Sequence, residues 1–344
     1  MKVYETGEIR NVAVVGHSGS GKTTLIERLL FQTGATSRMG SVVQGTTLMD
    51  FEEEEIRRQS SISTSVAWFE RNGVKVNLLD TPGYLDFIGE VNTALDVCDG
   101  ALVLVEALSG VEVGTEVAWR RILDRKMPRV IVVNRMNREN VRLRRVKEGL
   151  EEHFGDNLVQ LQIPLGEGPD FRGVIDLLAM ECRLGDNDRR EPIPDELKEE
   201  ADAARLAVVE AAALGDDALM EKYFEEDWLD DKDVVRGLRL AMQKGEIVPV
   251  LYSAPEIGYA VLPVLGALTR LMPSPDVVEP TVAEQLDGDL VDVVCASDGP
   301  LAAFVFKNRD DQYGKTSYIK VCSGQLSSDS RVFDMGKGQE IRVS

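Results

Sequence analysis

The sequence has few of the features that stabilise secreted proteins or anchor proteins in membranes. Its 344 residues include four cysteines, Cys98, Cys182, Cys295 and Cys322, with no Cys-x-x-Cys spacing among them. Scattered cysteines of this kind are typical of buried thiols in a reducing compartment rather than of disulfide frameworks or zinc sites. No apolar run approaches the roughly 18 residues that cross a membrane, and residues 1–10 contain no apolar stretch typical of a signal peptide. We therefore expect a cytoplasmic protein with no membrane partner.

Positive charge is also scarce in this chain. There are 39 lysines and arginines against 59 aspartates and glutamates, which gives a net charge of −20 at neutral pH. Proteins that bind DNA through bulk electrostatics need the opposite balance, so we expect no DNA partner. The strongest basic cluster lies at residues 135–147, where the spacing predicts Arg138, Arg142 and Arg145 on one helical stripe. This stripe is either a solvated helix face or a contact to RNA phosphate.

A glycine-rich octapeptide near the N-terminus has the pattern of a phosphate-binding loop. It runs from Gly16 to Thr23 and follows an apolar run at 11–15 that predicts a buried strand. Residues 24–31 then have the apolar spacing of a helix. A loop in this position presents amide N–H groups and a helix dipole to an anion, with Lys22 as the point charge. The alternative interpretation is a tight turn that binds nothing. The residues predicted to hold phosphate are Gly16, His17, Ser18, Gly19, Ser20, Gly21, Lys22, Thr23 and Thr24.

Residues 35–65 have the composition of a region rich in loops. An acidic stretch followed by a basic one at 50–58 predicts a short solvated helix. The hydroxyl cluster at 60–63 is of more interest, because nucleotide-sensing loops need a hydroxyl that can bind Mg²⁺.

A hairpin is predicted next. Asn-Gly at residues 72–73 separates two apolar runs, 65–69 and 74–79, and this pattern is a strong hairpin signal. The second run ends in Asp80-Thr81-Pro82-Gly83. A carboxylate at the end of a strand beside a phosphate loop can hold Mg²⁺, and the glycine leaves its N–H free to approach a terminal phosphate.

Strands and helices alternate through the rest of the first 280 residues. Apolar runs at 101–105, 130–133 and 247–251 predict buried strands, with a helix near 113–125. This alternation predicts an α/β fold with a mostly parallel sheet and helices on both faces. Polar residues follow two of these strands, and loops at strand carboxyl ends are where such sheets bind ligands.

Four short stretches occur in the order of a known signature: GHSGSGKTT at 16–24, DTPG at 80–83, NRMN at 134–137 and YSA at 252–254. In this order they resemble translational GTPases, most of all elongation factor G or its elongation-factor-G-like paralogue. Residues 86–91, 164–177 and 271–275 support the resemblance. It extends over essentially all 344 residues but only the front half of such a factor, so we expect a fragment.

The resemblance implies a P-loop GTP-binding domain over residues 1–280, with a helical insert at 159–250. The helices predicted in this insert begin at 194 and cover 216–226 and 231–244. The insert is strongly acidic, which indicates either a solvated helical face or a docking surface for a partner. Residues 281–344 contain short strands between turns rich in glycine and aspartate, and they resemble the start of the family's β-barrel second domain.

The resemblance also implies ligands, partners and roles for matching residues. The implied ligands are GTP or GDP and Mg²⁺, and the implied partner is the ribosome, both its RNA and its proteins. Besides the phosphate-binding loop, the implied nucleotide contacts are Asp80, Gly83, Asn134, Arg135, Asn137, Ser253 and Ala254. The implied Mg²⁺ ligands are Thr23, Ser61 and Asp80, and the implied catalytic residues are Lys22 and Tyr84.

Tyr84 departs from the family pattern, which has a histidine after DTPG that orients the attacking water. A phenol, with a pKa of about 10, can hydrogen-bond a water but is a poor proton acceptor at neutral pH. We therefore expect slow GTP hydrolysis and a blunted response to ribosomes.

The guanine motif departs as well, because the family's Asn-Lys-x-Asp reads Asn134-Arg135-Met136-Asn137 here. Arg135 can still cover the base plane, but Asn137 lacks the second acceptor that guanine N1–H and N2–H require. The mismatch is expected to cost about 1–3 kcal/mol of GTP binding. Xanthosine nucleotides are expected to gain, because their carbonyl can accept from the Asn137 amide. Ser61 replaces a family threonine and keeps the hydroxyl.

Three functions are compatible with these residues. The first is a GTPase that acts on the ribosome through a nucleotide switch, with slow or altered hydrolysis. The second is a GTP-sensing ribosome-binding module that does not hydrolyse, and the third is a P-loop kinase or ATPase. Guanine against adenine binding separates the third from the others, and single-turnover hydrolysis with ribosomes separates the first two.

Overall fold

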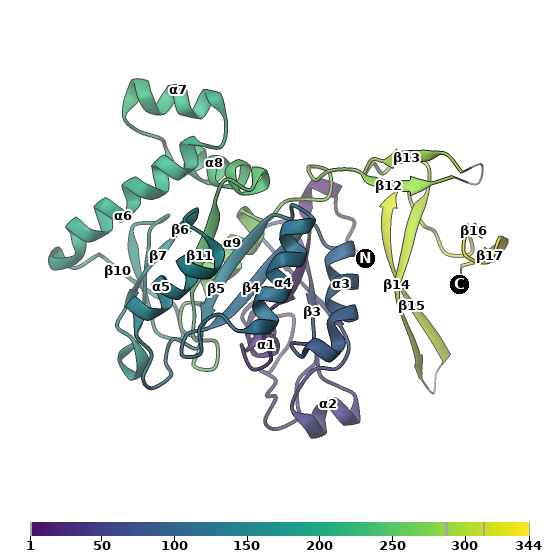
Figure 1. The fold of residues 1–344 in the computed structure, drawn as a ribbon, viewed down its shortest axis with the longest axis horizontal. Helices are drawn as coiled ribbons and strands as arrows, with labels where there is room; N and C mark the ends of the chain where they lie inside the picture. Colours follow the sequence, from purple (N-terminus) through teal and green to yellow (C-terminus); the bar gives the residue numbers. More distant parts are fainter. Residues whose placement is uncertain (1, 286–287, 312–313, 344) are drawn as a thin grey trace. The chain divides into compact units, whose positions relative to one another are not determined.

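The computed structural model describes residues 2–285, 288–311 and 314–343. These residues form two compact units, one made of Arg10–Pro273 and the other of the residues up to Ile9 together with those from Ser274 onward. The predicted fold class is confirmed, because the larger unit is built on a mostly parallel sheet with helices on both faces (Figure 1).

The central sheet of the larger unit has seven strands among the described residues, in the order β2-β3-β1-β4-β5-β11-β6. They are β1 (Ile9–Val15), β2 (Ser65–Arg71), β3 (Val74–Asp80), β4 (Gly100–Glu106), β5 (Arg129–Asn134), β6 (Leu158–Gln160) and β11 (Val248–Tyr252). The strands from β1 through β4, β5 and β11 to β6 pair in parallel. The predicted hairpin of β2 and β3 is confirmed, and Asn72 and Gly73 both have the positive φ that a tight hairpin turn requires.

Helices cover both faces of this sheet (Figure 1). The helices around it are α1 (Lys22–Gln32), α2 (Glu53–Arg58), α3 (Ile88–Val97), α4 (Val113–Asp124), α5 (Leu143–Phe154) and α9 (Val261–Arg270). α1 packs on α9, whereas α3 packs on α4, and α4 meets α5 through the rings of Trp119 and Phe154, whose centroids are 4.2 Å apart. Every residue of β4 and β5 is buried between these layers, as expected for apolar parallel strands. No helix in the described ranges is long and apolar enough to span a membrane.

The insert contains more than the helices that the sequence predicted. Its three helices are α6 (Asp195–Ala213), α7 (Asp217–Glu226) and α8 (Asp231–Lys244). An unpredicted four-stranded antiparallel sheet precedes them, made of β7 (Gln162–Leu165), β8 (Gly173–Asp176), β9 (Glu181–Leu184) and β10 (Arg189–Glu191). α6 and α8 approach closely at Gly237, where a Cβ would lie 2.1 Å from the carbonyl oxygen of Ala212.

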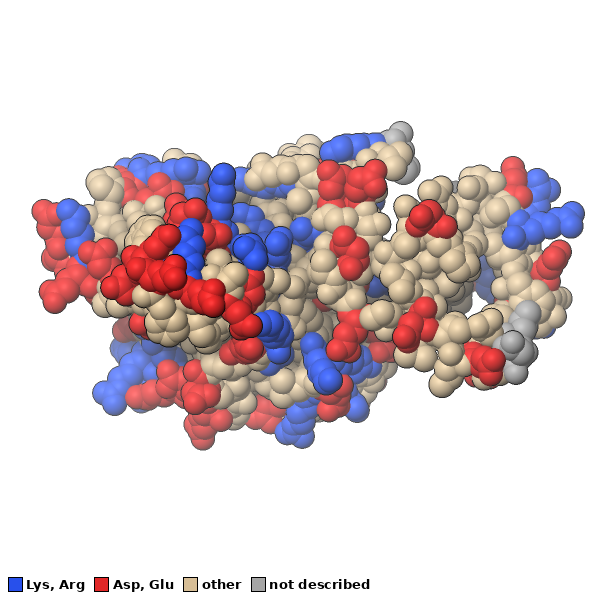
Figure 2. Space-filling model, turned by 90° about the horizontal axis from the view of Figure 1, so that it is seen from above, with Lys and Arg blue, Asp and Glu red and all other residues tan. Residues whose placement is uncertain are grey.

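The acidic residues on the three helices of the insert are exposed or partly exposed. Figure 2 shows aspartate and glutamate side chains gathered over the helices of the insert. At the end of α7, Glu225, Glu226 and Asp227 are exposed beside Phe224, whose exposed fraction is 75%. A surface of this kind suits both interpretations made from the sequence, a solvated face and a docking surface.

The predicted helical stripe of arginines is wrong, because α5 begins only at Leu143. Arg138 and Arg142 precede the helix and face acidic partners instead. Arg138 Nη2 lies 3.2 Å from Glu256 Oε1, and Arg142 Nη1 lies 3.6 Å from Glu167 Oε1. The spacing of three and four residues was helical, but the chain there forms a loop.

The smaller unit consists of short antiparallel ladders. They pair β12 (Thr281–Glu284) with β13 (Leu290–Val293), β14 (Ala302–Asp311) with β15 (Gly314–Ser323), and β16 (Arg331–Asp334) with β17 (Gln339–Arg342). Apolar side chains on these strands stay exposed, with exposed fractions of 71% for Leu290 and 50% for Phe304. The β-barrel expected for this region remains a prediction.

Candidate functional site

The glycine-rich loop joins β1 to α1, as the sequence predicted. Gly21 is the N-cap of α1 and has a φ of 88°. A Cβ at this position would lie 2.4 Å from Asn134 Nδ2, and a Cβ on Gly16 would lie 2.4 Å from the carbonyl oxygen of Leu104. Glycine is therefore required by close packing at both ends of the loop, and the loop folds tightly against the carboxyl ends of β4 and β5.

Lys22 is buried at the base of this loop. Its Nζ donates hydrogen bonds to the carbonyl oxygens of Gly16, at 2.9 Å, and His17, at 3.0 Å. Burial lowers the pKa of Lys22 to about 8, although the negative charges of Asp80 and Asp50 oppose this shift. A buried ammonium held only by neutral carbonyls is suited to a ligand of negative charge.

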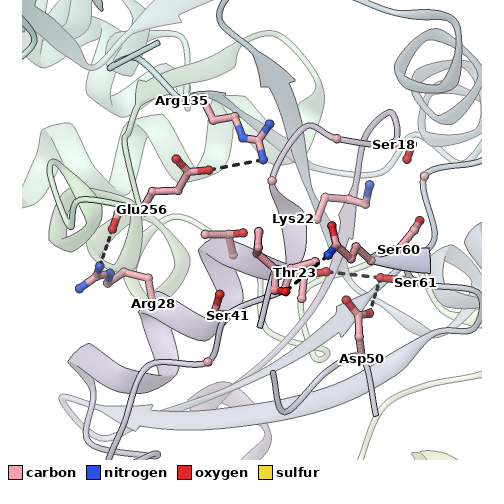
Figure 3. A pocket seen from close by; sticks show the side chains of 18 of the residues that line it. Ser18, Lys22, Thr23, Arg28, Ser41, Asp50, Ser60, Ser61, Arg135 and Glu256 are labelled. Atoms are coloured by element: carbon pink, nitrogen blue, oxygen red, sulfur yellow. Dashed lines mark hydrogen bonds and ion pairs between the residues drawn. The ribbon is translucent and has the colours of Figure 1, made fainter. Parts of the chain in front are cut away.

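The three predicted Mg²⁺ ligands meet at one point. Thr23 Oγ1 donates to Asp80 Oδ2 at 2.7 Å and lies 3.3 Å from Ser61 Oγ. Ser61 Oγ donates to Asp50 Oδ1 at 2.7 Å (Figure 3). We call Lys22 and these four residues the inner end of the site. Asp50 was not predicted, because in the sequence it stands at the start of a charged run that is typical of a solvated helix.

The inner end fits a divalent cation of the Mg²⁺ type. Its donors are hydroxyl and carboxylate oxygens, which Mg²⁺ prefers, and Asp80 Oδ1 is buried without a hydrogen-bond partner. Burial raises the pKa of Asp80 to about 7, although Thr23 and Lys22 oppose the shift, and burial also raises the pKa of Asp50. Burial disfavours the charged form of both carboxyls, and a bound cation would stabilise that form.

The loops after β5 and β11 are tied to the phosphate-binding loop by one side chain. Asn134 Nδ2 donates to the carbonyl oxygen of Ser20 at 2.8 Å, and Asn134 Oδ1 accepts from Ser253 Oγ at 3.1 Å. The backbone N–H of Arg135 also donates to Asn134 Oδ1, at 2.8 Å, while Arg135 itself has a φ of 60°. The predicted convergence of these loops is thus present in the structure.

A cavity of about 590 Å³ opens in front of these loops. The predicted site residues that line it are Ser18, Gly19, Gly21, Lys22, Thr23, Thr24, Ser61, Gly83 and Arg135. Its lining does not include the predicted residues Gly16, His17, Ser20, Asp80, Tyr84, Asn134, Asn137, Ser253 and Ala254. The lining residues that the sequence analysis missed include Arg28, Asp50, Arg138 and Glu256. We call Arg135, Arg138 and Glu256 the outer end of the site.

Gly83 and Tyr84 are neighbours in the sequence, but Gly83 packs against the phosphate-binding loop whereas Tyr84 is half exposed to solvent. A Cβ on Gly83 would lie 2.4 Å from the backbone nitrogen of Ser18 and 2.6 Å from Lys22 Nζ, so this glycine touches the phosphate-binding loop. Tyr84 precedes the short 3-10 helix Leu85–Phe87, and half of it is exposed to solvent. The phenol therefore borders the site without lining the cavity.

His17 has a structural role that the sequence analysis did not give it. Its Nδ1 accepts from the backbone N–H of Gly114 at 3.2 Å, and its Nε2 lies 3.5 Å from a carboxylate oxygen of Glu112. Its own backbone N–H donates to Thr115 Oγ1 at 3.0 Å. The side chain and backbone of His17 together join the phosphate-binding loop to the start of α4.

Comparison with known proteins identifies related chains. The model of the elongation factor Tu GTP-binding domain matches residues 7–274. Elongation factor G of Thermotoga neapolitana is 35% identical over all of this chain and half of its own length. Elongation factor G of Gluconobacter oxydans is 34% identical over 98% of this chain and half of its own length. The chain thus spans about half the length of these curated relatives.

A solved structure gives the same result at the level of the fold. The chain is similar to a protein of Thermus thermophilus with a TM-score of 0.85 and 34% sequence identity. The similarity covers 98% of this chain and 48% of that protein. At this identity the likeness concerns the sequence as well as the fold.

Proposed function

The chain belongs to the elongation factor Tu GTP-binding domain family, and within it to translational GTPases of the elongation factor G type, and from this premise we propose that it is a nucleotide-dependent ribosome-binding factor. In this proposal it binds GTP and GDP with Mg²⁺, and it hydrolyses GTP slowly. The partner is the ribosome, because the family signature in the sequence resembles that of factors that act there.

The inner end of the site carries this proposal. Thr23, Ser61 and Asp80 come from three separate segments, yet Thr23 Oγ1 lies within hydrogen-bonding distance of an oxygen of each of the other two. Such a cluster beside the buried Lys22 is the arrangement that binds a nucleotide phosphate together with a divalent cation. Thr23, Ser61 and Asp80 would hold Mg²⁺, with Asp50 fixing the hydroxyl of Ser61. When bound, this ion supplies positive charge to the phosphate oxygens.

Lys22 and the glycines act on the phosphates themselves. Lys22 is 6% exposed, and the carbonyls that its ammonium group bonds are neutral, so an anionic phosphate is a stronger partner. Gly83 brings the loop after β3 within contact distance of Lys22. In the proposed switch, this loop senses whether a terminal phosphate is present.

The position and chemistry of Tyr84 support slow hydrolysis. Its side chain is half exposed and lies outside the cavity lining, and a neutral phenol accepts protons poorly at neutral pH. The same observation favours the second candidate function, a GTP-sensing ribosome-binding module without turnover. The two differ only in whether the bound triphosphate is cleaved.

Two measurements test the proposal. The first is a titration of the chain with GTP, GDP, ATP and xanthosine triphosphate, with and without Mg²⁺. We expect guanine nucleotides to bind more tightly than ATP, and equal binding of ATP would contradict the proposal. The second is single-turnover GTP hydrolysis with and without ribosomes. Slow cleavage supports the first function, and no cleavage despite ribosome binding supports the second.

A further inference from the structure

The outer end of the site contains an ion-pair cluster centred on Glu256. Its Oε1 lies 3.2 Å from Arg138 Nη2 and 3.5 Å from Arg135 Nη2. Figure 3 shows the Glu256 carboxylate pointing toward Arg135, on the opposite side of the cavity from Ser61. The side chain of Glu256 is 36% exposed and that of Arg135 is 24% exposed, so the cluster lies at the mouth of the cavity.

The backbone around Glu256 is held in place from a second direction. Arg28, on α1, donates from Nε to the carbonyl oxygen of Pro255 at 2.7 Å and from Nη2 to that of Glu256 at 3.0 Å. The backbone N–H of Ile257 also donates to the carbonyl oxygen of Ala254 at 3.2 Å. Glu256 therefore sits on a braced turn, and its carboxylate faces the cavity in a defined position.

A guanine base presents an edge of hydrogen-bond donors that needs more acceptors than Asn137 offers. N1–H and the N2 amino group are donors, whereas an asparagine has one carbonyl oxygen. Asn137 Oδ1 is buried and has no hydrogen-bond partner, and although Asn137 does not line the cavity, the family signature assigns this position to the base edge. A second acceptor must come from another residue.

We propose that Glu256 supplies this second acceptor and is a specificity-determining residue for guanine. The described residues that line the cavity include two carboxylates, Asp50 and Glu256. Asp50 is bonded to Ser61 at the inner end, which leaves Glu256 as the carboxylate at the outer end. In this assignment Asn137 Oδ1 accepts from N1–H and Glu256 accepts from the N2 amino group. The inference rests on the proposed guanine-nucleotide function.

The positive charges of Arg135 and Arg138 favour a carboxylate at the position of Glu256. Their guanidinium groups lie 3.5 and 3.2 Å from Glu256 Oε1, and hydrogen bonds to a charge-paired carboxylate are strong. Hypoxanthine lacks the N2 amino group and would lose the bond to Glu256. Xanthine has a carbonyl at that position, which would face the carboxylate and be repelled. Glu256 thus opposes the preference for xanthine that Asn137 alone would give.

The test compares dissociation constants for GTP, inosine triphosphate, xanthosine triphosphate and ATP between the unchanged chain and Glu256→Gln. We expect Glu256→Gln to weaken GTP binding by roughly ten- to a hundredfold, the factor that corresponds to a hydrogen bond with a charged group. Inosine triphosphate should bind as before, and xanthosine triphosphate should gain relative to GTP. The matched control is Glu181→Gln, because Glu181 also lies between two arginines, Arg183 and Arg190, but outside the cavity lining.

The ratio of GTP to inosine triphosphate affinity separates recognition from positioning. If Glu256 only held Arg135 in place, Glu256→Gln would weaken the binding of all four nucleotides equally, and this outcome would overturn the inference. A ratio of GTP to inosine triphosphate affinity that Glu256→Gln left unchanged would likewise overturn the inference. Asn137→Asp in the Glu256→Gln background should restore GTP binding, because it returns a carboxylate to the base edge. A chain that bound GTP no better than ATP before mutation would instead overturn the proposed function, and this inference with it.

Discussion

The inner and outer ends of the site differ in burial and in the kind of bond that holds them. At the inner end Thr23, Ser61 and Asp80 are each less than a tenth exposed. Thr23 donates to Asp80, Ser61 donates to Asp50, and the two hydroxyl oxygens lie 3.3 Å apart. At the outer end Arg135 and Glu256 are partly exposed and pair at 3.5 Å. The buried end suits the part that all nucleotides share, the phosphates. The open end suits the part that varies between them, the base.

A substitution of Lys22 should weaken phosphate binding at the inner end, and so lower the affinity for every nucleotide. We expect Lys22→Ala to weaken GTP and GDP binding by at least about a hundredfold, because a buried charge that faces the phosphates is lost. Thermal unfolding should show a folded variant. Lys75→Ala is the control, since this lysine stacks on Trp68 in the hairpin, 5.1 Å from the ring centroid, and lies outside the cavity lining. Unchanged affinity in a folded Lys22→Ala variant would contradict the assignment of the loop.

A change at Tyr84 should alter the reaction and leave binding at both ends intact. Tyr84→His is expected to raise the ribosome-stimulated hydrolysis rate by about one to two orders of magnitude, because imidazole accepts a proton near neutral pH. Single-turnover kinetics measure the effect. Tyr84→Phe serves as the control and should stay slow. Fast stimulated hydrolysis by the unchanged chain would show that Tyr84 does not limit the rate.

Thr23 tests whether the inner end holds a cation. Thr23→Ala should weaken GTP binding about tenfold in Mg²⁺, the equivalent of one hydrogen bond or ligand, and should have little effect in the presence of a chelator. Thr33→Ala removes a hydroxyl just beyond the other end of α1, where it bonds to the carbonyl oxygen of Leu29. Thr33→Ala should change neither the GTP affinity in Mg²⁺ nor the GTP affinity in the presence of the chelator. If Thr23→Ala lowered GTP affinity equally with and without Mg²⁺, Thr23 would not be a ligand of the cation.

The smallest effect is expected at Asn137, because in our proposal the Glu256 carboxylate already supplies the second acceptor. Asn137→Asp should raise GTP affinity by no more than about fivefold in the unchanged chain. Without the Glu256 carboxylate the gain should be larger. Calorimetric titrations of both backgrounds provide the comparison. A large gain in the unchanged chain would mean that Asn137 alone decides the base preference.

The residues that local patterns could identify are those whose neighbours in the sequence determine their structure. The turn at Gly16–Thr23 lies between an apolar strand and a helix, and Asn72-Gly73 requires positive φ, so both were predicted from a few positions. The meeting of the loops at Asn134 and Ser253 followed from a general rule, since parallel strands bring their carboxyl ends to one edge of a sheet.

The remaining parts depend on contacts between distant residues. Arg28 and Glu256 are bonded although 228 positions separate them, and no pattern near either residue indicates the other. Asp50 looks like part of a solvated acidic helix until Ser61 is seen beside it. The arginines at 138 and 142 have helical spacing, but the chain forms a loop there. The strands β7–β10 have only three or four residues each, too few to show an alternation pattern.

The two hydrogen bonds from Arg28 have a consequence for how this site could be redesigned. α1 starts at Lys22 and carries Arg28 six positions later, about 9 Å along the helix axis. The turn that bears Glu256 is therefore hydrogen-bonded to the same helix whose first residue, Lys22, belongs to the phosphate-binding loop. A design that moved residues 253–258 next to a helix without an arginine at this position would lose both hydrogen bonds.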